Sequence, residues 1–230
     1  MSYVLRGSCY LIGIFFVLLL CYSILPTLFY IARAWCGRKE VKKRTLFLTF
    51  DEGPSYKYTT ELLELLERHR VKATFFVRPS AAKRNPILIQ RMKRAGHTIQ
   101  LKGLAYGTPL LAGPLKTTKS LKSAEQILKE ENVNVTAFRP AHGCLNLSVL
   151  WYLRKHRIHL EYWNVLASDR LIFENKGSIA SRMYKRTRPG RIFFLHDGET
   201  NDHTPLEMLE ALKIMIPYWI NLGYEFECIK

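Results

Sequence analysis

The stretch LTFDEGP, residues 48–54, places two adjacent carboxylates, Asp51 and Glu52, at the end of an apolar run that begins at Thr45. The run has the length and composition of a buried β-strand, and the Gly-Pro pair that follows it predicts a turn. Neighbouring carboxylates repel one another, so such a pair usually requires a cation or a shared proton. A strand that simply ends in a polar turn would look the same, so the other segments of the chain must decide.

From residue 45 onward, short apolar runs alternate with amphipathic helical patterns. Strands are expected at 45–50, 73–77, 97–101, 136–138, 158–165, 191–196 and 224–229. Helices are expected at 59–69, 85–95, 117–130, 146–156, 178–186 and 204–222, with Asn85 as the N-cap of the second. This alternation is typical of parallel sheets with helical crossovers, and it favours a barrel-like α/β fold over an open sheet.

Titratable side chains follow five of the expected strands. They are Asp51 and Glu52, Lys102 with Tyr106 further along, Arg139, Asp169 and His196. Each alone could be a surface acid, a structural arginine or a buried histidine. Because the carboxyl ends of barrel strands meet at one rim, we expect these side chains to form a site there.

Three segments of this chain resemble motifs of the polysaccharide deacetylase family (carbohydrate esterase family 4, the NodB homology domain). They are LTFDEGP, FRPAHG at 138–143 and FFLHDG at 193–198, and the resemblance covers about residues 45–230. It implies a distorted (β/α)7 barrel. It also implies hydrolytic removal of N-acetyl or O-acetyl groups from amino-sugar glycans, with a divalent metal, usually zinc, held by one Asp and two His.

The resemblance also implies a role for individual residues. Asp51 matches the general base, Arg139 the residue that orients it, His196 the general acid, and Asp169 the carboxylate that tunes this histidine. These roles suit amide hydrolysis, which needs an activated water on one side and a protonated nitrogen on the other. The groove residues predicted to contact the substrate are Pro140, His142, Trp163 and Leu195.

The metal ligands depart from the family pattern. Glu52 stands where the metal-binding Asp is expected, and Lys102 and Tyr106 stand where the two histidines are expected. A protonated lysine has only donors, and a tyrosine must lose a proton whose pKa is about 10. We expect Lys102 to bring its ammonium to the vacated position and to pair with Asp51 or Glu52. A rebuilt zinc site from Glu52, His142 and His203 is the alternative.

Two functions follow from this pattern. The chain is either a deacetylase with an altered centre, or a silent pseudoenzyme that binds a glycan or a partner in the old groove. The formal net charge is +16, of which +6 lies in residues 1–44 and +10 in residues 45–230. Charge alone would permit a nucleic-acid partner, but no motif supports one, so none is expected.

Residues Cys9–Ala32 carry no charged side chain. Twenty-four helical residues span roughly 36 Å, which is enough to cross a bilayer and longer than an ordinary signal-peptide core. We therefore expect residues 1–44 to form a single-pass membrane anchor with a basic juxtamembrane segment, followed by the deacetylase-like domain at 45–230.

The membrane side stays open at this stage. Only Arg6 precedes the span and six basic residues follow it, which favours a cytoplasmic domain and a lipid-linked sugar as ligand. Members of the resembled family act outside the cytoplasm. The five cysteines show no metal-type spacing and do not indicate a redox compartment.

Overall fold

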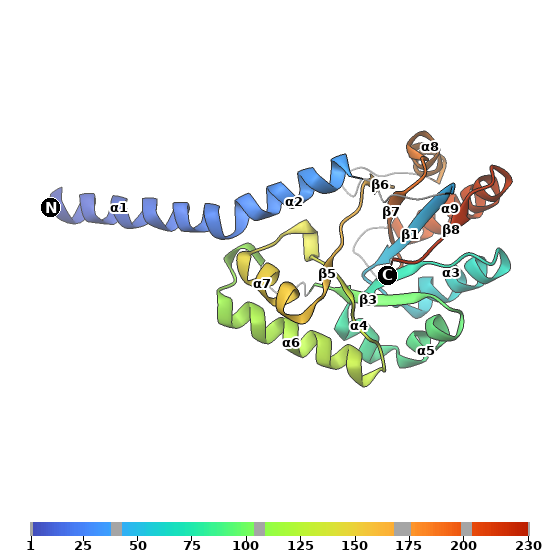
Figure 1. Cartoon of the computed structure of the whole chain (residues 1–230), viewed down its shortest axis with the longest axis horizontal. Helices are drawn as coiled ribbons and strands as arrows, with labels where there is room; N and C mark the ends of the chain where they lie inside the picture. Colours follow the sequence, from blue (N-terminus) through green and yellow to red (C-terminus); the bar gives the residue numbers. More distant parts are fainter. Residues whose placement is uncertain (1, 38–42, 104–108, 168–175, 199–203, 230) are drawn as a thin grey trace.

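The computed structural model describes residues 2–37, 43–103, 109–167, 176–198 and 204–229 (Figure 1). Its centre is a parallel sheet in the order β5-β4-β3-β2-β1-β7-β6, with β8 paired to β1. The strands are β1 (Thr45–Asp51), β2 (Thr74–Val77), β3 (Thr98–Lys102), β4 (Ala137–Arg139), β5 (His159–Leu160), β6 (Val165–Leu166), β7 (Arg191–His196) and β8 (Glu225–Phe226). The sheet curls into a distorted barrel, as the sequence predicted.

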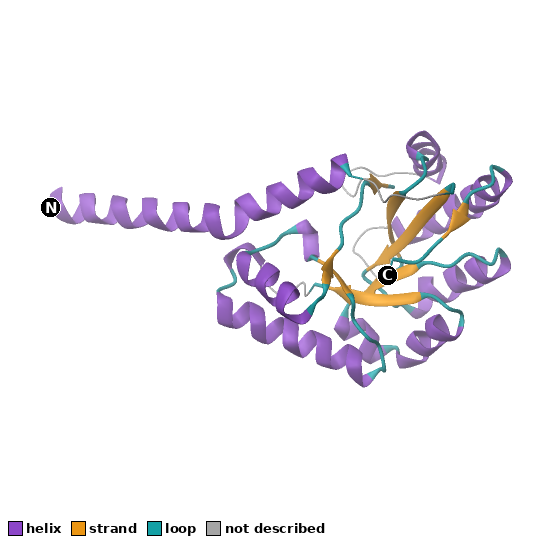
Figure 2. Ribbon diagram, in the orientation of Figure 1, coloured by secondary structure: helices purple, strands orange, loops and turns teal. Residues whose placement is uncertain are grey.

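Helices cover the outer face of the curled sheet (Figure 2). They are α3 (Tyr56–Arg68), α4 (Pro79–Arg84), α5 (Pro86–Arg94), α6 (Pro114–Glu130), α7 (Leu147–His156), α8 (Lys176–Arg186) and α9 (Thr204–Asn221), with 3-10 turns η2 (Pro109–Leu111) and η3 (Ala141–Gly143). Helix α4 was not predicted. Asn85 is the N-cap residue of α5, as predicted, but its side chain makes no capping hydrogen bond and instead donates to the carbonyls of Pro54 and Ala81.

The two faces of β1 explain how the barrel positions a site. Leu46, Leu48 and Phe50 are fully buried against the helices, whereas Asp51 ends the column of alternating side chains that face the barrel interior. A small apolar cluster fills that interior below the site; its buried members are Phe47, Phe76, Ala137, Ile192 and Ile229. A charged group at the end of this column therefore lies on a tightly packed apolar base, which restricts its movement.

The sheet is open between β5 and β6, where a single strand was expected. Residues 161–164 cross this gap, and the N–H groups at its two ends still bond to the neighbouring strands: Glu161 donates to the carbonyl of Phe138 (2.9 Å) and Asn164 to that of Ile192 (3.3 Å). Arg139 donates to the carbonyls of Glu161 (3.4 Å) and Tyr162 (3.3 Å). The Asn164 side chain donates to the carbonyl of Gly37 and accepts from the Ile192 N–H, both at 2.9 Å. Side-chain hydrogen bonds thus help to fix the segment that crosses the gap, while β5 and β6 do not pair with each other.

One helical rod forms the N-terminal region. It consists of α1 (Ser2–Leu19), a π-helical turn η1 (Leu20–Ile24) and α2 (Leu25–Cys36). The wider turn lies directly before Pro26, which has no N–H to continue the α-helical ladder. An 18-residue window within Ser8–Cys36 has a mean hydropathy of 2.4, so this helix is long and apolar enough to span a membrane.

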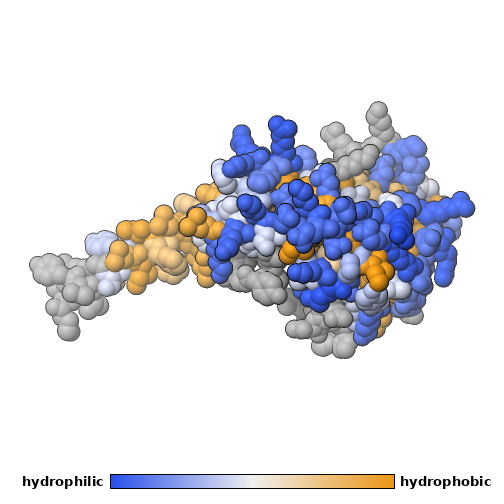
Figure 3. Space-filling view, turned by 90° about the horizontal axis from the view of Figure 1, so that it is seen from below, coloured by the Kyte–Doolittle hydropathy of each residue, from blue (hydrophilic) through white to orange (hydrophobic). Residues whose placement is uncertain are grey.

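The two halves of the rod have different surroundings. Helix α2 packs on the barrel, and the Thr27 hydroxyl exchanges hydrogen bonds with the carbonyl (3.1 Å) and N–H (2.8 Å) of Leu145. Helix α1 stands away from the domain as an apolar projection beside a largely polar body (Figure 3). The fold therefore uses residues that the sequence assigned to the anchor.

Candidate functional site

Four titratable side chains end four parallel strands at one rim of the barrel. Asp51 ends β1, Lys102 ends β3, Arg139 ends β4 and His196 ends β7. The register places Asp51 opposite His196 and Lys102 opposite Arg139. Each of these residues is at most 3% exposed. The strand-end rule thus brings together side chains that are up to 145 positions apart in the sequence.

Asp51 lies between two cations. Lys102 Nζ is 2.5 Å from Oδ2, and Arg139 Nη1 is 2.6 Å from Oδ1. Burial disfavours the charged carboxylate, but Arg139 and then Lys102 outweigh it, so the pKa of Asp51 lies below its usual value. The ion pair that the sequence predicted for Lys102 is therefore present.

Glu52 is held by the chain around it. Its φ is 81°, and its N–H donates to the carbonyl of Phe76 at 3.3 Å. A Cβ added to Gly198 would lie 2.4 Å from the Glu52 carbonyl carbon, so only glycine fits there. The Glu52 carboxylate forms an ion pair with Arg78 and lies 3.7 Å from Lys102 Nζ. Arg78 was missed by the sequence analysis, although it directly follows β2 and the strand-end rule would have found it.

Arg139 is fixed by several partners in addition to Asp51. Its Nη1 donates to Thr49 Oγ1 at 2.7 Å, and its guanidinium carbon lies 3.9 Å from the centre of the Phe76 ring. The Thr49 hydroxyl in turn donates to the carbonyl of Phe193 at 2.6 Å. A guanidinium with this many partners has one orientation, which fits the positioning role predicted for it.

Asp197 is a third buried carboxyl at the rim, after Asp51 and Glu52. The sequence analysis missed it, although it stands inside the FFLHDG motif. Its Oδ1 accepts from the Gly53 N–H (3.2 Å) and its Oδ2 from the Thr59 hydroxyl (2.8 Å). Burial, with a further contribution from the Asp51 charge, raises the pKa of Asp197 to about 7. The rim therefore holds one carboxyl that stays charged and one that titrates near neutral pH.

His196 has aromatic neighbours. Its ring meets Phe194 edge-on at 4.5 Å, and Phe194 stacks on Trp163 at 4.2 Å. Asp169, the carboxylate predicted to tune His196, lies outside the described residues, as do Tyr106 and His203. Their predicted roles stay predictions.

The four predicted substrate contacts have different surroundings. Pro140 is buried, His142 is exposed with a φ of 52°, and Trp163 is half-buried. Leu195 is completely buried in the main core, because it alternates with His196 on β7 and points toward the helices. The structure therefore gives Leu195 no surface for a substrate.

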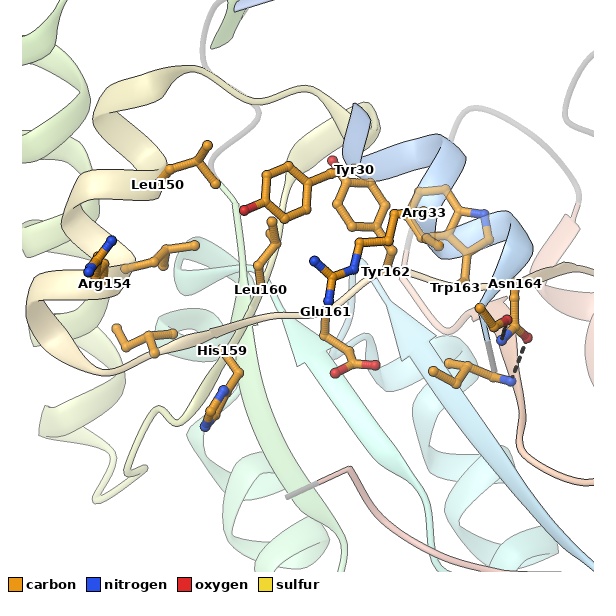
Figure 4. Close-up of a pocket in the computed structure, with 15 residues that line it drawn as sticks. Tyr30, Arg33, Leu150, Arg154, His159, Leu160, Glu161, Tyr162, Trp163 and Asn164 are labelled. Atoms are coloured by element: carbon orange, nitrogen blue, oxygen red, sulfur yellow. Dashed lines mark hydrogen bonds between the residues drawn. The ribbon is translucent and has the colours of Figure 1, made fainter. Parts of the chain in front are cut away.

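A cavity of about 460 Å³ lies between α2 and the open side of the sheet, and none of the described rim side chains lines it (Figure 4). Tyr30 and Arg33 line it from α2, and Tyr162 and Trp163 line it from the segment that crosses the gap. The Trp163 ring lies 5.7 Å from the Arg139 guanidinium. Aromatic rings at this cavity are suitable for stacking on sugars.

The donors around the acid pair do not fit a zinc ion. Lys102, Arg78 and Arg139 surround Asp51 and Glu52, and all three are donors without a free lone pair. Within the described ranges, no cluster of three His, Cys, Asp or Glu side chains is close enough to ligate a metal.

His97 cannot substitute as a ligand from its place in the fold. It precedes β3, at the end opposite Lys102, and its Nδ1 accepts from the Ala73 N–H at 3.2 Å. Burial and the Lys72 charge lower the pKa of His97 to about 4. This neutral histidine therefore has a structural role.

Known proteins share this fold and sequence pattern. The sequence model of the polysaccharide deacetylase family matches residues 38–160. The peptidoglycan-N-acetylmuramic acid deacetylase PdaA of Bacillus subtilis is 31% identical over 199 residues, which cover 82% of this chain and 71% of that protein.

Two solved structures superpose well. A peptidoglycan N-acetylglucosamine deacetylase has a TM-score of 0.76 at 23% identity, covering 84% of this chain and 89% of that one. A CE4 family pseudoenzyme from Bacillus anthracis has a TM-score of 0.73 at 21% identity, covering 84% and 66%. At such identities these two structures support the fold alone. The family match and the relative at 31% identity show that this chain belongs to the polysaccharide deacetylase family.

Proposed function

We propose that this protein is a membrane-anchored member of the family that binds an amino-sugar glycan at its rim and does not hydrolyse it. The observation that carries this proposal is the Lys102 ammonium, which lies 2.5 Å from Asp51 at the position where a metal ligand is expected. The glycan class follows from the relative named for peptidoglycan.

The electrostatics of Asp51 support the loss of hydrolysis. A general base must accept a proton near neutral pH and must reach a water molecule. Both oxygens of Asp51 are occupied by cations and its pKa is lowered, so it is a weak base. A Lewis acid would supply several kcal/mol at the transition state, and an ammonium group cannot coordinate the substrate oxygen in that way.

An active deacetylase with an altered centre is the second candidate. It is favoured by the retention of Asp51 and His196 on paired positions of neighbouring strands, with Arg139 oriented toward Asp51. In that case Asp51 removes a proton from water, His196 protonates the leaving amine, and Asp169 holds His196.

Metal analysis and an assay on acetylated chito-oligomers separate the two candidates. The full chain in detergent should contain no zinc bound through the rim, release no acetate, and still bind the oligomers in calorimetry. Acetate release that disappears in Asp51→Asn would overturn the proposal. Glu64→Gln, at a surface carboxylate on α3, is the matched control and should behave as the unchanged protein.

Membrane anchoring is the second part of the proposal. Cleavage near Ala32-Arg33-Ala34 would remove Thr27 and Tyr30, which pack on the barrel. An uncleaved helix is therefore favoured. The mature protein should start before residue 9 by mass spectrometry and should resist carbonate extraction. The flanking charges favour a cytoplasmic domain, and a topology reporter fused after Lys230 tests the side.

A further inference from the structure

The apolar helix leaves the barrel at the end that carries the candidate site. The Tyr22 hydroxyl donates to Ser148 Oγ at 2.8 Å, and the Ser23 hydroxyl donates to the carbonyl of Leu110 at 2.7 Å. Leu110 belongs to the connection after β3, and Ser148 to the first turn of α7 after β4. These connections follow the strands that end in Lys102 and Arg139, and α1 extends outward from this end (Figures 1 and 3).

The part of the apolar helix that lies outside the domain is short compared with the thickness of a bilayer. Helix α1 has 18 residues, or about 27 Å, and the hydrocarbon core is about 30 Å thick. Since α2 is already packed on the barrel, α1 and the adjoining turn η1 must cross the core almost alone. If α1 and η1 span the bilayer, the rim next to η1 must therefore lie at the membrane surface.

The rim carries exposed apolar side chains around the base of the helix. We call them the rim collar: Leu111 (63% exposed), Leu115 (90%), Leu147 (48%) and Trp151 (56%). They come from η2, from the first turn of α6 and from the first two turns of α7, and α6 and α7 pack side by side. The side chain of Asn146 ties these elements together, donating to the carbonyl of Ala112 at 3.2 Å. A clustered apolar surface marks an interaction site, whereas single exposed apolar residues do not.

The charges near the rim collar suit an anionic membrane. Neither residues 109–124 nor residues 140–156 contain an Asp or Glu, whereas Lys116, Lys119 and Lys155 lie exposed among them. Lys155 Nζ lies 4.9 Å from the centre of the Trp151 ring. Tryptophan beside lysine is typical of the membrane–water interface, and lysines there attract anionic headgroups.

We propose that the rim collar lies in the membrane interface, so that the candidate site faces the bilayer rather than the bulk solvent. The proposal rests on the anchoring proposed above, and it holds on either side of the membrane. A site in this orientation is presented to saccharides carried by a lipid. It therefore favours a lipid-linked amino sugar as the ligand over a free polymer.

Quenching of tryptophan fluorescence by brominated lipid tests the orientation. The full chain is placed in vesicles of phosphatidylcholine and phosphatidylglycerol, with and without bromine on the acyl chains. Bromine should quench the unchanged protein, and most of this quenching should disappear in Trp151→Phe. Trp35 is the matched control. It is also exposed, but it lies about 15 Å along α2 from the start of this helix at Leu25, away from the rim. Trp35→Phe should retain the quenching.

The outcomes separate this inference from the anchoring. Protein that resists carbonate extraction but keeps its quenching in Trp151→Phe would leave the anchor intact and overturn the orientation. Quenching lost in Trp35→Phe instead would place the opposite end of the barrel at the membrane. Protein that is extracted by carbonate would overturn the anchoring and this inference together.

Discussion

Replacing Lys102 by methionine should destabilise the protein markedly. Lys102 is 2% exposed and its partner Asp51 is fully buried, so the substitution leaves a buried carboxylate with one cation fewer. Removing one member of a buried ion pair typically costs roughly 3–5 kcal/mol. Because Arg139 still holds Oδ1 at 2.6 Å, we expect the lower end, about 3 kcal/mol. For a chain of this size that corresponds to a melting temperature lower by roughly 6–12 °C.

The destabilisation caused by Lys102→Met should depend on pH. The folded-state pKa of Asp51 is depressed, so its contribution to stability is present above its unfolded pKa and is lost as the pH falls through the folded value. Without Lys102 the folded pKa rises. The difference in melting temperature between Lys102→Met and the unchanged protein should therefore be largest near pH 7 and should narrow as the pH falls below about 4.

Thermal unfolding of the full chain in detergent, followed by circular dichroism, measures this effect. Lys122→Met, at an exposed position of α6, is the control and should change the free energy of unfolding by less than about 0.5 kcal/mol. The double variant with Asp51→Asn should cost less than the sum of the two single variants, because the lysine and the aspartate are directly coupled. Additive costs, or a loss in Lys102→Met no larger than in the control, would refute the reasoning.

Three further outcomes are expected. Because the pKa of Asp197 is raised in the folded state, the free energy of unfolding should fall as the pH rises from about 4 to about 7. Asp197→Asn should remove this pH dependence, as measured by urea unfolding at a series of pH values. The triple variant Glu52→Asp, Lys102→His and Tyr106→His restores the family's ligand types, and it should bind one zinc per chain by metal analysis where the unchanged protein binds none at the rim. Thr27→Val removes a buried hydroxyl that exchanges two hydrogen bonds with the β4–α7 connection, and it should lower stability by about 1–3 kcal/mol in urea titrations. Thr118→Val on α6 removes a partly exposed hydroxyl that donates only within its own helix, to the carbonyl of Pro114, and it should cost less.

Much of the fold was predictable because local pattern and topology agreed. The apolar runs of β1 and β7, and the amphipathic pattern of α3, are where the sequence indicates them. The strand-end rule then predicted that Asp51, Arg139 and His196 converge, since parallel strands have their carboxyl ends on one side. Period-two alternation similarly places Leu195 in the core, which the sequence analysis overlooked when it assigned that residue to the substrate.

The residues that replace the expected metal ligands also allowed a prediction from the sequence alone. Lysine has no lone pair to offer a metal, so its presence after β3 predicted an ion pair, and the structure contains it. The family follows from the same motifs, because their order and spacing survive even where individual ligands have changed.

The sequence by itself determined the alternation of strands and helices, the length and apolar composition of the N-terminal helix, and the types of side chain at the rim. Only the tertiary structure decided that Arg78 reaches Glu52, that Asp197 is buried enough to titrate near neutral pH, and that α2 packs across the open side of the sheet so that α1 leaves beside the site. The physical reason is that burial and charge pairing depend on which distant segments meet in space, whereas periodicity and donor chemistry are properties of the residues themselves.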